Sequence, residues 1–215
     1  MIILGLTGSI GMGKSTTAGM FADEGAVVWN ADDAVHQLYS RGGAAVEPVG
    51  QAFPGVVIEG AVDRSRLAEA LGRDDAAFKR LEAIVHPLVA AGRAGELAEA
   101  AERGVKLAVL DIPLLFEGGG RDAFHAVVVV TADAETQARR VLARPGMTRA
   151  RFEAILERQM PDAEKRRLAD FIVETDQGLG AARDTVRTIV ATVLDPDWTS
   201  PHRWVLTGLL PTAES

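Results

Sequence analysis

Five short apolar segments recur along the chain, separated by stretches with helical periodicity. Continuous apolar runs of this length are typical of strands buried on both faces of a parallel sheet. We predict strands at residues 2–6, 26–29, 106–110, 126–130 and 171–173. The remaining pattern predicts helices at residues 14–24, 32–40, 64–103 with breaks, 134–143, 148–160, 162–169 and 179–194. This alternation predicts an α/β fold, with a parallel five-stranded sheet and helices on both faces.

About 75 residues separate the second and third predicted strands, which is too long for one crossover connection. Their mostly helical pattern predicts an insertion at about residues 36–104. Residues 1–194 are expected to form one domain that carries it. The last segment, 195–215, has three prolines and little periodicity, and it contains Trp198 and Trp204. We expect an irregular tail there, held in place by a tryptophan.

The amino-acid composition excludes several classes of site and of protein. The chain has 215 residues, of which 47% are hydrophobic and 25% charged, as is ordinary for a globular protein. It has no cysteine, which excludes disulfides, thiolate nucleophiles and zinc–thiolate sites and fits a reducing compartment. No apolar run approaches the length of a membrane span, and the apolar N-terminus is too short for a signal peptide. We therefore expect no membrane partner.

Charge is distributed unevenly along the chain. The net charge of −7 argues against a general nucleic-acid binder. Residues 139–167, however, contain nine Lys or Arg and four Asp or Glu, so this segment carries +5 and the rest −12. A local basic patch on an acidic protein suits a compact anionic ligand, although charge runs are more often a solvated helical face.

The segment that follows the first strand, Gly8 to Ser15, reads Gly-Ser-Ile-Gly-Met-Gly-Lys-Ser and fits G-x-x-x-x-G-K-[ST], the phosphate-binding P-loop. Glycines let backbone N–H groups close around a polyphosphate, and the helix that follows adds its positive end. Lys14 would place charge on the β/γ oxygens, and Ser15 would offer a hydroxyl to Mg²⁺. The residues expected to bind the nucleoside triphosphate are Gly8, Gly11, Met12, Gly13, Lys14, Ser15 and Thr16.

Acidic residues follow two of the other strands. Asp32 follows the second strand, where a carboxylate can accept a proton from an attacking hydroxyl or help to hold Mg²⁺. The alternative is that Asp32 or Asp33 only caps the helix that follows. Asp111 closes the third strand and resembles a Walker B acid that would steady the Mg²⁺ shell.

A helical lid is predicted at about residues 139–167, where Arg140 and Arg144 face the same way. Arginines on a mobile lid can stabilise charge on a transferring phosphoryl group and exclude water. Gly118-Gly119-Gly120 invites interpretation as a second phosphate loop, but a flexible loop fits better because no lysine follows. The four histidines have no metal-ligand spacing, and without a base-reading motif a GTPase is disfavoured.

Taken together, these residues resemble the dephospho-coenzyme A kinase family over nearly the whole chain up to about residue 194. The P-loop alone is shared by many kinases. More specific are the segments at His86-Pro87-Leu88, at 111–117 (Asp-Ile-Pro-Leu-Leu-Phe-Glu) and at 169–173 (Ala-Asp-Phe-Ile-Val), together with Ala31-Asp32, the Arg140/Arg144 helix and Gln159.

The resemblance implies ATP-dependent, Mg²⁺-assisted phosphorylation of the ribose 3′-hydroxyl of dephospho-CoA, which yields CoA and ADP in the last step of CoA synthesis. It implies a P-loop NTPase-type core, a helical CoA-binding insertion and a lid, in a cytoplasmic protein. By position, Asp32 would be the general base, and Lys14 and Arg140 would stabilise the phosphoryl group. Arg144 would bind ATP, and Ser15 and Asp111 would hold the metal. The acceptor would be met by Thr7, Asp32, His86, Leu114, Leu115 and Glu117.

The sequence departs from the family pattern at three places. Asn30-Ala31-Asp32 stands where Asp-Ala-Asp is usual, so the base is placed at Asp32. Thr175 stands where an asparagine near the adenine is frequent. The lid loop, residues 144–147, is less polar than usual.

Two alternatives remain open. One is another small P-loop kinase that acts on a nucleoside monophosphate or a metabolite hydroxyl. The other is a nucleotide-dependent switch that hydrolyses ATP slowly whatever acceptor is added. For the leading interpretation we expect dephospho-CoA as the partner, no nucleic acid and a monomer or weak oligomer.

Overall fold

The computed structural model describes residues 1–202, apart from the side chain of Asp122, and forms two compact units. The described part of the first unit comprises residues 1–29 and 100–202, and that of the second comprises residues 30–99. The insertion was expected at about 36–104, so the observed second unit begins six residues earlier.

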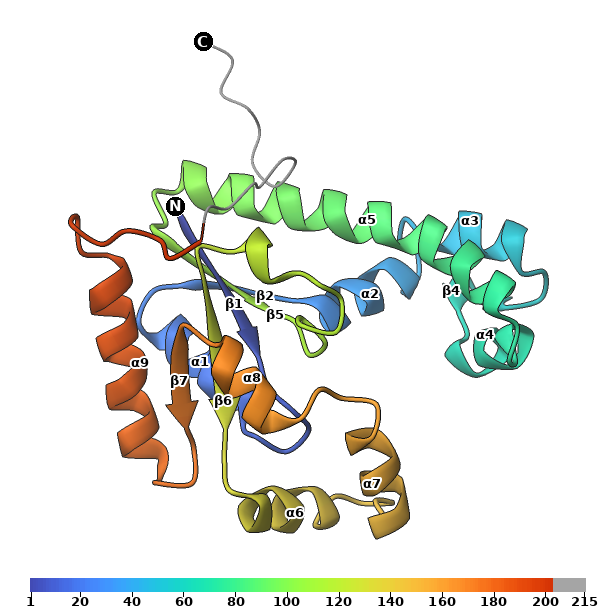
Figure 1. The fold of residues 1–215 in the computed structure, drawn as a ribbon. Helices are drawn as coiled ribbons and strands as arrows, with labels where there is room; N and C mark the ends of the chain where they lie inside the picture. The colour runs from blue at the N-terminus through green and yellow to red at the C-terminus, as the bar shows by residue number, and fades with distance from the viewer. Residues whose placement is uncertain (203–215) are drawn as a thin grey trace. The chain divides into compact units, whose positions relative to one another are not determined.

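The first unit is built on a five-stranded sheet with the order β2-β5-β1-β6-β7 (Figure 1). β1 pairs in parallel with both β5 and β6, and β6 pairs in parallel with β7. The predicted α/β fold with a parallel sheet is confirmed. The strands are β1 (Ile2–Thr7), β2 (Val27–Asn30), β5 (Leu107–Asp111), β6 (Ala126–Thr131) and β7 (Phe171–Glu174).

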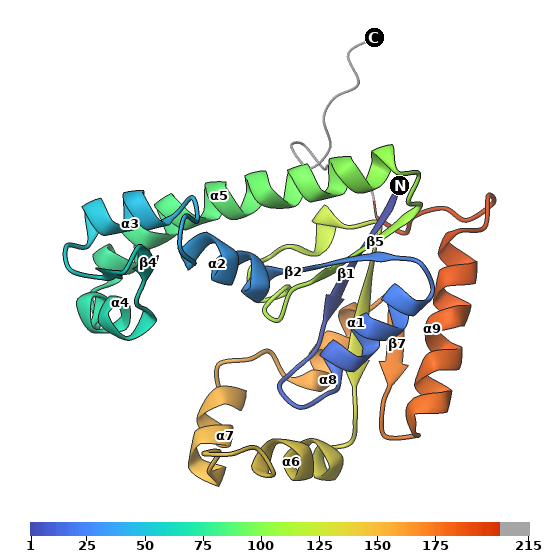
Figure 2. The same ribbon diagram turned by 180° about the vertical axis from the view of Figure 1, so that it is seen from behind.

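Helices cover both faces of this sheet. α1 (Lys14–Asp23) and α9 (Leu179–Val193) share one apolar core with β1, β5, β6 and β7. α8 (Asp162–Leu168) lies in front of the sheet in Figure 1, whereas α1 lies in front in the reverse view of Figure 2. α6 (Ala134–Leu142), α7 (Arg149–Leu156) and the 3₁₀ turn η1 (Arg121–Ala123) complete the described helices of this unit.

The helix predicted at 148–160 ends four residues early, at Leu156. Gln159 accepts a hydrogen bond from the backbone N–H of Ile10, and the N–H of Met160 donates to Glu117. These groups are used in tertiary contacts, and Pro161 disfavours helical geometry at the residue before it. The sequence pattern alone does not show that tertiary contacts end the helix.

The second unit has its own core, formed around Tyr39, Val49, Phe53 and Leu67. Its elements are α2 (Ala31–Tyr39), α3 (Val46–Ala52), β3 (Val57–Ile58), β4 (Ala61–Val62), α4 (Arg64–Leu71) and α5 (Asp75–Glu102), whose last residues belong to the first unit. α3 and the antiparallel β3–β4 hairpin were not predicted. The hairpin turns through Glu59 and Gly60, both at positive φ, as two-residue hairpin turns require.

α5 is 28 residues long and continues through Pro87 without a break. The helix predicted at 64–103 with breaks is interrupted between α4 and α5, at residues 72–74, and not at His86-Pro87. A proline removes one backbone donor from the helical ladder, yet a long helix packed on a core tolerates the loss.

Residues 195–202 are irregular and attached to the first unit. Trp198 packs against its core, and the Ser200 hydroxyl donates to the carbonyl of His125 at 2.6 Å. A His202 ring nitrogen lies 2.6 Å from an Asp170 carboxylate oxygen. Trp204, the other tryptophan expected in this tail, lies outside the described residues. Within the described chain, every helix is too short or too polar to cross a bilayer.

Candidate active site

The loop between β1 and α1 has the shape expected of a phosphate cradle. Gly11 and Gly13 have φ values of 80° and 93°, a region that residues with a Cβ rarely adopt. α1 begins at Lys14 with Gly13 at its N-cap, and in the described structure no side chain caps it. The first N–H groups of a helix have no partner within the helix, so this end of α1, with Ser15 and Thr16 exposed in its first turn, can accept an anion.

Lys14, the first residue of α1, lies against Asp111, the last residue of β5. The Lys14 ammonium forms an ion pair with the carboxylate of Asp111, whose side chain is 1% exposed at the end of β5. The predicted P-loop lysine and the predicted Walker B acid are therefore in contact.

Met12 attaches the loop to the residues that follow β6 and β7. The Thr175 hydroxyl donates to the Met12 carbonyl at 2.8 Å, and the buried Met12 sulfur accepts the N–H of Ala132 at 3.1 Å. Gly8 faces β6, because a Cβ there would lie 2.6 Å from the Val130 carbonyl oxygen. The described structure gives Thr175 a role in holding the loop, which the sequence comparison with the family did not suggest.

Arg140 of α6 lies beside the same network. Its guanidinium donates to the hydroxyl and to the carbonyl of Thr175, both at 2.8 Å, and reaches the Gly11 carbonyl at 3.5 Å. Its charge is therefore held next to the P-loop by two strong hydrogen bonds.

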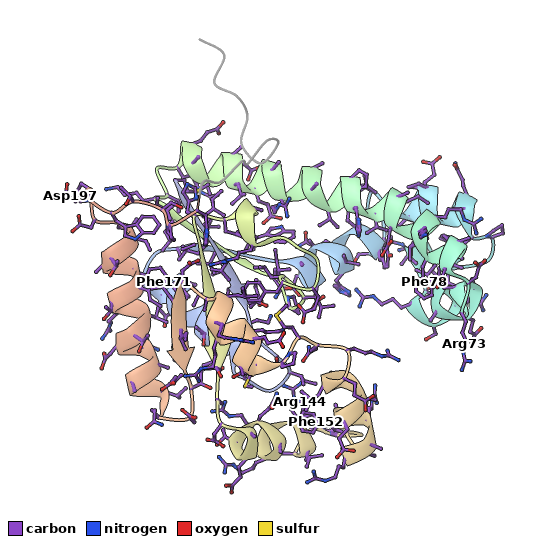
Figure 3. All side chains as sticks on the ribbon, in the orientation of Figure 1. Arg73, Phe78, Arg144, Phe152, Phe171 and Asp197 are labelled. Atoms are coloured by element: carbon purple, nitrogen blue, oxygen red, sulfur yellow. The ribbon has the colours of Figure 1, made fainter. Side chains whose placement is uncertain are left out.

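A cavity of about 290 Å³ opens beside this arginine. Its walls include Gly13, Thr16, Arg140, Arg144, Thr175 and Leu179. Arg144 follows α6 and lies in the lid segment, as does the buried Phe152 of α7 (Figure 3). The size and the neighbouring P-loop suit a small polar ligand such as a nucleoside.

The predicted acceptor residues of the first unit lie in different surroundings. The buried Thr7 hydroxyl, at the end of β1, donates to the carbonyl of Pro113 at 3.1 Å. Leu114 is 50% exposed, whereas Leu115 is buried and packs against Gly5 of β1. Of this pair, only the Leu114 side chain is open to a ligand.

Glu117 forms an ion pair with a buried lysine, which was not predicted. One of its oxygens lies 3.0 Å from the Lys165 ammonium, which is fully buried on α8, and accepts the Met160 N–H at 2.8 Å. Burial acts to raise the pKa of Glu117, but these hydrogen bonds and the lysine charge outweigh it and hold the pKa below its ordinary value. Glu117 thus joins the loop after β5 to the end of the lid segment.

The basic patch predicted at 139–167 is smaller than its charge suggests. Lys165 is buried with Glu117, and Arg166 pairs with Glu174 at 2.8 Å. These two charges are used within the protein, whereas Arg144, Arg151 and Arg158 remain exposed.

Asp32 does not cap α2. The side chain of Asn30 accepts the N–H groups of Asp32 and Asp33, at 2.8 and 3.1 Å. The alternative that Asp32 or Asp33 serves as the cap is therefore wrong, and both carboxylates are exposed. Asparagine and aspartate are both strong N-caps, which explains why the replacement at position 30 is tolerated structurally.

His86 and the triple glycine take no part in the P-loop interactions described above. His86 is exposed on α5 of the second unit. The N–H groups of Gly118, Gly119 and Gly120 donate to the carbonyls of Leu114, Phe116 and Leu115. Because these donors are used in successive turns, the glycines do not form a second phosphate loop.

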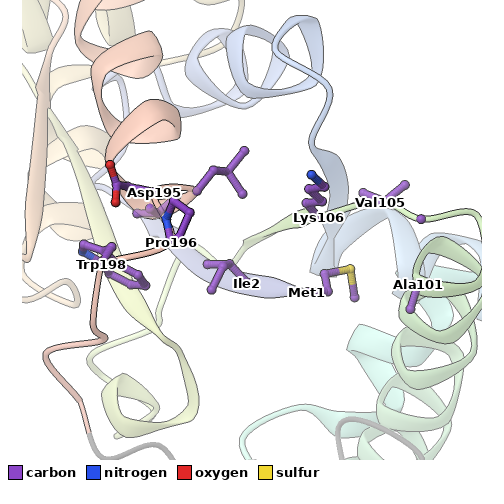
Figure 4. Close-up of a pocket in the computed structure, with 11 residues that line it drawn as sticks. Met1, Ile2, Ala101, Val105, Lys106, Asp195, Pro196 and Trp198 are labelled. Atoms are coloured by element: carbon purple, nitrogen blue, oxygen red, sulfur yellow. The ribbon is translucent and has the colours of Figure 1, made fainter.

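A second cavity of about 410 Å³ lies at the opposite ends of the strands, lined by residues that include Ile2, Lys106, Asp195 and Trp198 (Figure 4). Ligands of open parallel sheets bind at the C-terminal strand ends, so this cavity is separate from the phosphate site.

The donor set near the P-loop fits Mg²⁺. Ser15 and Asp111 offer a hydroxyl and a carboxylate, the hard oxygen ligands that this ion prefers. The described residues contain no cluster of three or more His, Asp or Glu side chains that could hold a metal alone.

The comparisons with known proteins place these features in a family. The family model for dephospho-CoA kinase matches residues 2–180. A dephospho-CoA kinase of Mesorhizobium japonicum is 60% identical over 190 residues, which cover 88% of this chain and 95% of the relative. A solved Thermus thermophilus structure is 35% identical with a TM-score of 0.77, covering 90% of this chain and 97% of the other. The dephospho-CoA kinase structure from Campylobacter jejuni (24% identical, TM-score 0.65, covering 89% and 96%) supports the same fold.

Proposed function

The chain belongs to the dephospho-CoA kinase family, and we propose that it transfers the γ-phosphoryl group of ATP to the ribose 3′-hydroxyl of dephospho-CoA. The 3′-oxygen forms a bond to the γ-phosphorus as the bond from that phosphorus to the β–γ bridging oxygen breaks. The products are CoA and ADP, and the hydroxyl proton passes to a base.

The observation that carries the donor half is the contact between Lys14 of the P-loop and Asp111 at the end of β5. Together with Ser15, these residues provide a cation for the phosphates and oxygen ligands for Mg²⁺, which when bound would neutralise charge on the phosphate oxygens. Arg140, fixed by Thr175, supplies a second cation beside the loop. The cavity bordered by Arg140, Arg144 and Leu179 would take the nucleoside of ATP.

For the acceptor half we assign the base to Asp32. Its carboxylate is exposed, and Asn30, not Asp32, caps α2, so the carboxylate is free of the capping role. It follows the C-terminal end of β2, the kind of position where open parallel sheets place functional groups. Thr7, His86, Leu114 and Glu117 are the further acceptor residues that the family resemblance implies, with Leu115 contributing through packing. A cytoplasmic, monomeric or weakly associating protein completes the proposal.

The test is ADP release from Mg·ATP with dephospho-CoA and with a panel of other acceptors, namely nucleoside monophosphates, shikimate and water. We expect strong stimulation by dephospho-CoA alone. Equal release with every acceptor would identify a slow ATPase switch, and preference for another hydroxyl would identify a different small-molecule kinase.

A further inference from the structure

Ile10, the third residue of the P-loop, is held from two sides by glutamine side chains. The Gln137 amide nitrogen donates to the Ile10 carbonyl at 2.8 Å, and the Ile10 N–H donates to the Gln159 amide oxygen at 3.1 Å. We call Gln137 and Gln159 the Ile10 clamp. The orientation of each amide follows from chemistry, because a backbone N–H can only donate and a carbonyl can only accept.

The two glutamines lie on either side of α7, one before it and one after it. Gln137 lies on α6, one turn before Arg140, and is only 7% exposed. Gln159 follows α7, and the next residue, Met160, donates its N–H to Glu117. The chain thus leaves the core near Ile10, forms the lid and returns to Ile10.

The Ile10 clamp lies next to the part of the loop that has positive φ angles. Gly11, the next residue, has a φ of 80°, and a Cβ there would lie 2.4 Å from a methyl carbon of Val141 on α6. Further along, Met12 is fixed through its carbonyl and its sulfur. Both backbone groups of Ile10 are thus satisfied by side chains, whereas the N-terminal end of α1 has no side-chain cap and can accept phosphate.

We propose that Gln137 and Gln159 are positioning residues that set the fit of the P-loop to the triphosphate and couple the loop to the lid. The proposal rests on the proposed function only in taking the ligand to be a nucleoside triphosphate. Neither residue touches the phosphates in this account. Each acts through Ile10.

The test uses the same substitution at both positions. Gln159→Glu keeps an oxygen that accepts the Ile10 N–H, whereas Gln137→Glu places a carboxylate against the Ile10 carbonyl and removes the donor. Both variants add one negative charge beside Ile10, so general repulsion of the nucleotide is closely matched. The difference between them therefore reports the direction of the hydrogen bonds.

Affinity for Mg·ADP is measured by calorimetry without an acceptor, and KM and kcat are measured with dephospho-CoA. We expect Gln137→Glu to bind Mg·ADP about 3- to 10-fold more weakly than Gln159→Glu, the scale of a lost hydrogen bond. The KM for dephospho-CoA should change less than twofold in both variants. Equal affinities in the two variants would overturn the proposal.

Methionine variants keep the test decisive if Gln137→Glu does not fold. Gln137→Met and Gln159→Met each remove one hydrogen bond without adding charge. Because both side chains hold Ile10, the variant with both substitutions should lose less Mg·ADP affinity than the two single losses added together. Full additivity, or no weakening in either variant, would contradict a shared clamp. Failure of the proposed function is distinguishable, since it would appear as wild-type ADP release that dephospho-CoA does not stimulate.

Discussion

The P-loop and the second unit differ in how their polar residues are held. Around the P-loop, Lys14, Thr175 and Arg140 each have defined partners, and Asp111 is buried. In the second unit, Asp32 and His86 are exposed on the surfaces of α2 and α5. A phosphate cradle gains from groups fixed before the ligand arrives, whereas a base must keep a carboxylate accessible to its substrate. This difference predicts separable effects on donor binding and on chemistry.

The largest expected effect is a fall in kcat without a matching change in nucleotide affinity. We expect Asp32→Asn to lower kcat by about 10²- to 10⁴-fold, the scale for loss of a general base. Mg·ATP affinity should change little, because Asp32 is not part of the P-loop. Steady-state kinetics and calorimetry measure the two quantities, with Asp33→Asn as the matched control on the same helix. A variant within a few-fold of wild type would rule out Asp32 as the base.

A substitution in the P-loop should lower turnover and nucleotide affinity together. We expect Lys14→Ala to lower kcat/KM for ATP by about 10²- to 10³-fold, as is typical when a cation that stabilises developing charge is removed. Nucleotide affinity should fall in parallel. Lys106→Ala, a lysine at the opposite ends of the strands, provides the control. Unchanged turnover in Lys14→Ala would contradict the assignment of the P-loop.

The ion pair between Glu117 and the buried Lys165 should contribute mainly to stability. Glu117→Gln leaves the fully buried ammonium without a carboxylate, so we expect the free energy of unfolding to fall by about 3 kcal/mol. Lys165→Met is the matched variant and should cost less, because the remaining carboxylate is 20% exposed and keeps the Met160 N–H. Urea denaturation of both variants gives the comparison, and the opposite order would contradict this account of the pair.

The same pair predicts a dependence on pH. The folded pKa of Glu117 is below its ordinary value, so its stabilisation is complete above the unfolded pKa of about 4.3 and is lost as pH falls through the folded pKa. Wild type should therefore lose more stability than Glu117→Gln when urea denaturation is repeated in this acidic range. Parallel losses would show that Glu117 is not the group involved.

The smallest expected effect concerns the start of α2. Asn30→Ala removes the acceptor for the N–H groups of Asp32 and Asp33, so we expect a loss of about 1 kcal/mol in unfolding free energy. Asn30→Asp should restore it, because aspartate caps equally well. If Asn30→Ala also lowered kcat while Asn30→Asp did not, the cap would be shown to orient Asp32.

Much of the first unit could be predicted because its signals are local. Apolar runs located all five strands to within one residue at each end, and the motif located the phosphate loop. α3 was missed because Pro48 and Gly50 lie inside it, and its helical form depends on packing in the second core. The β3–β4 hairpin was missed because each strand has only two residues, too few to show a period.

Within the site, the sequence indicated residue types but not their partners. Lys165 was counted as surface charge, since nothing in its local sequence shows that Glu117, 48 positions earlier, lies beside it. Gln137 carried no signal, and Gln159 was noted only through the family resemblance. Contacts that bring distant segments together depend on tertiary structure, and those contacts hold the P-loop.

The position of the transferred phosphate tests directly whether the enzyme phosphorylates the ribose 3′-hydroxyl. The enzyme is incubated with Mg·ATP and dephospho-CoA, and the product is analysed by phosphorus–proton correlation NMR. We expect a new phosphomonoester coupled to the 3′-proton of the adenosine ribose, with one ADP formed per ester. Inorganic phosphate as the only phosphorus product besides ADP, or an ester at any other hydroxyl, would contradict this expectation.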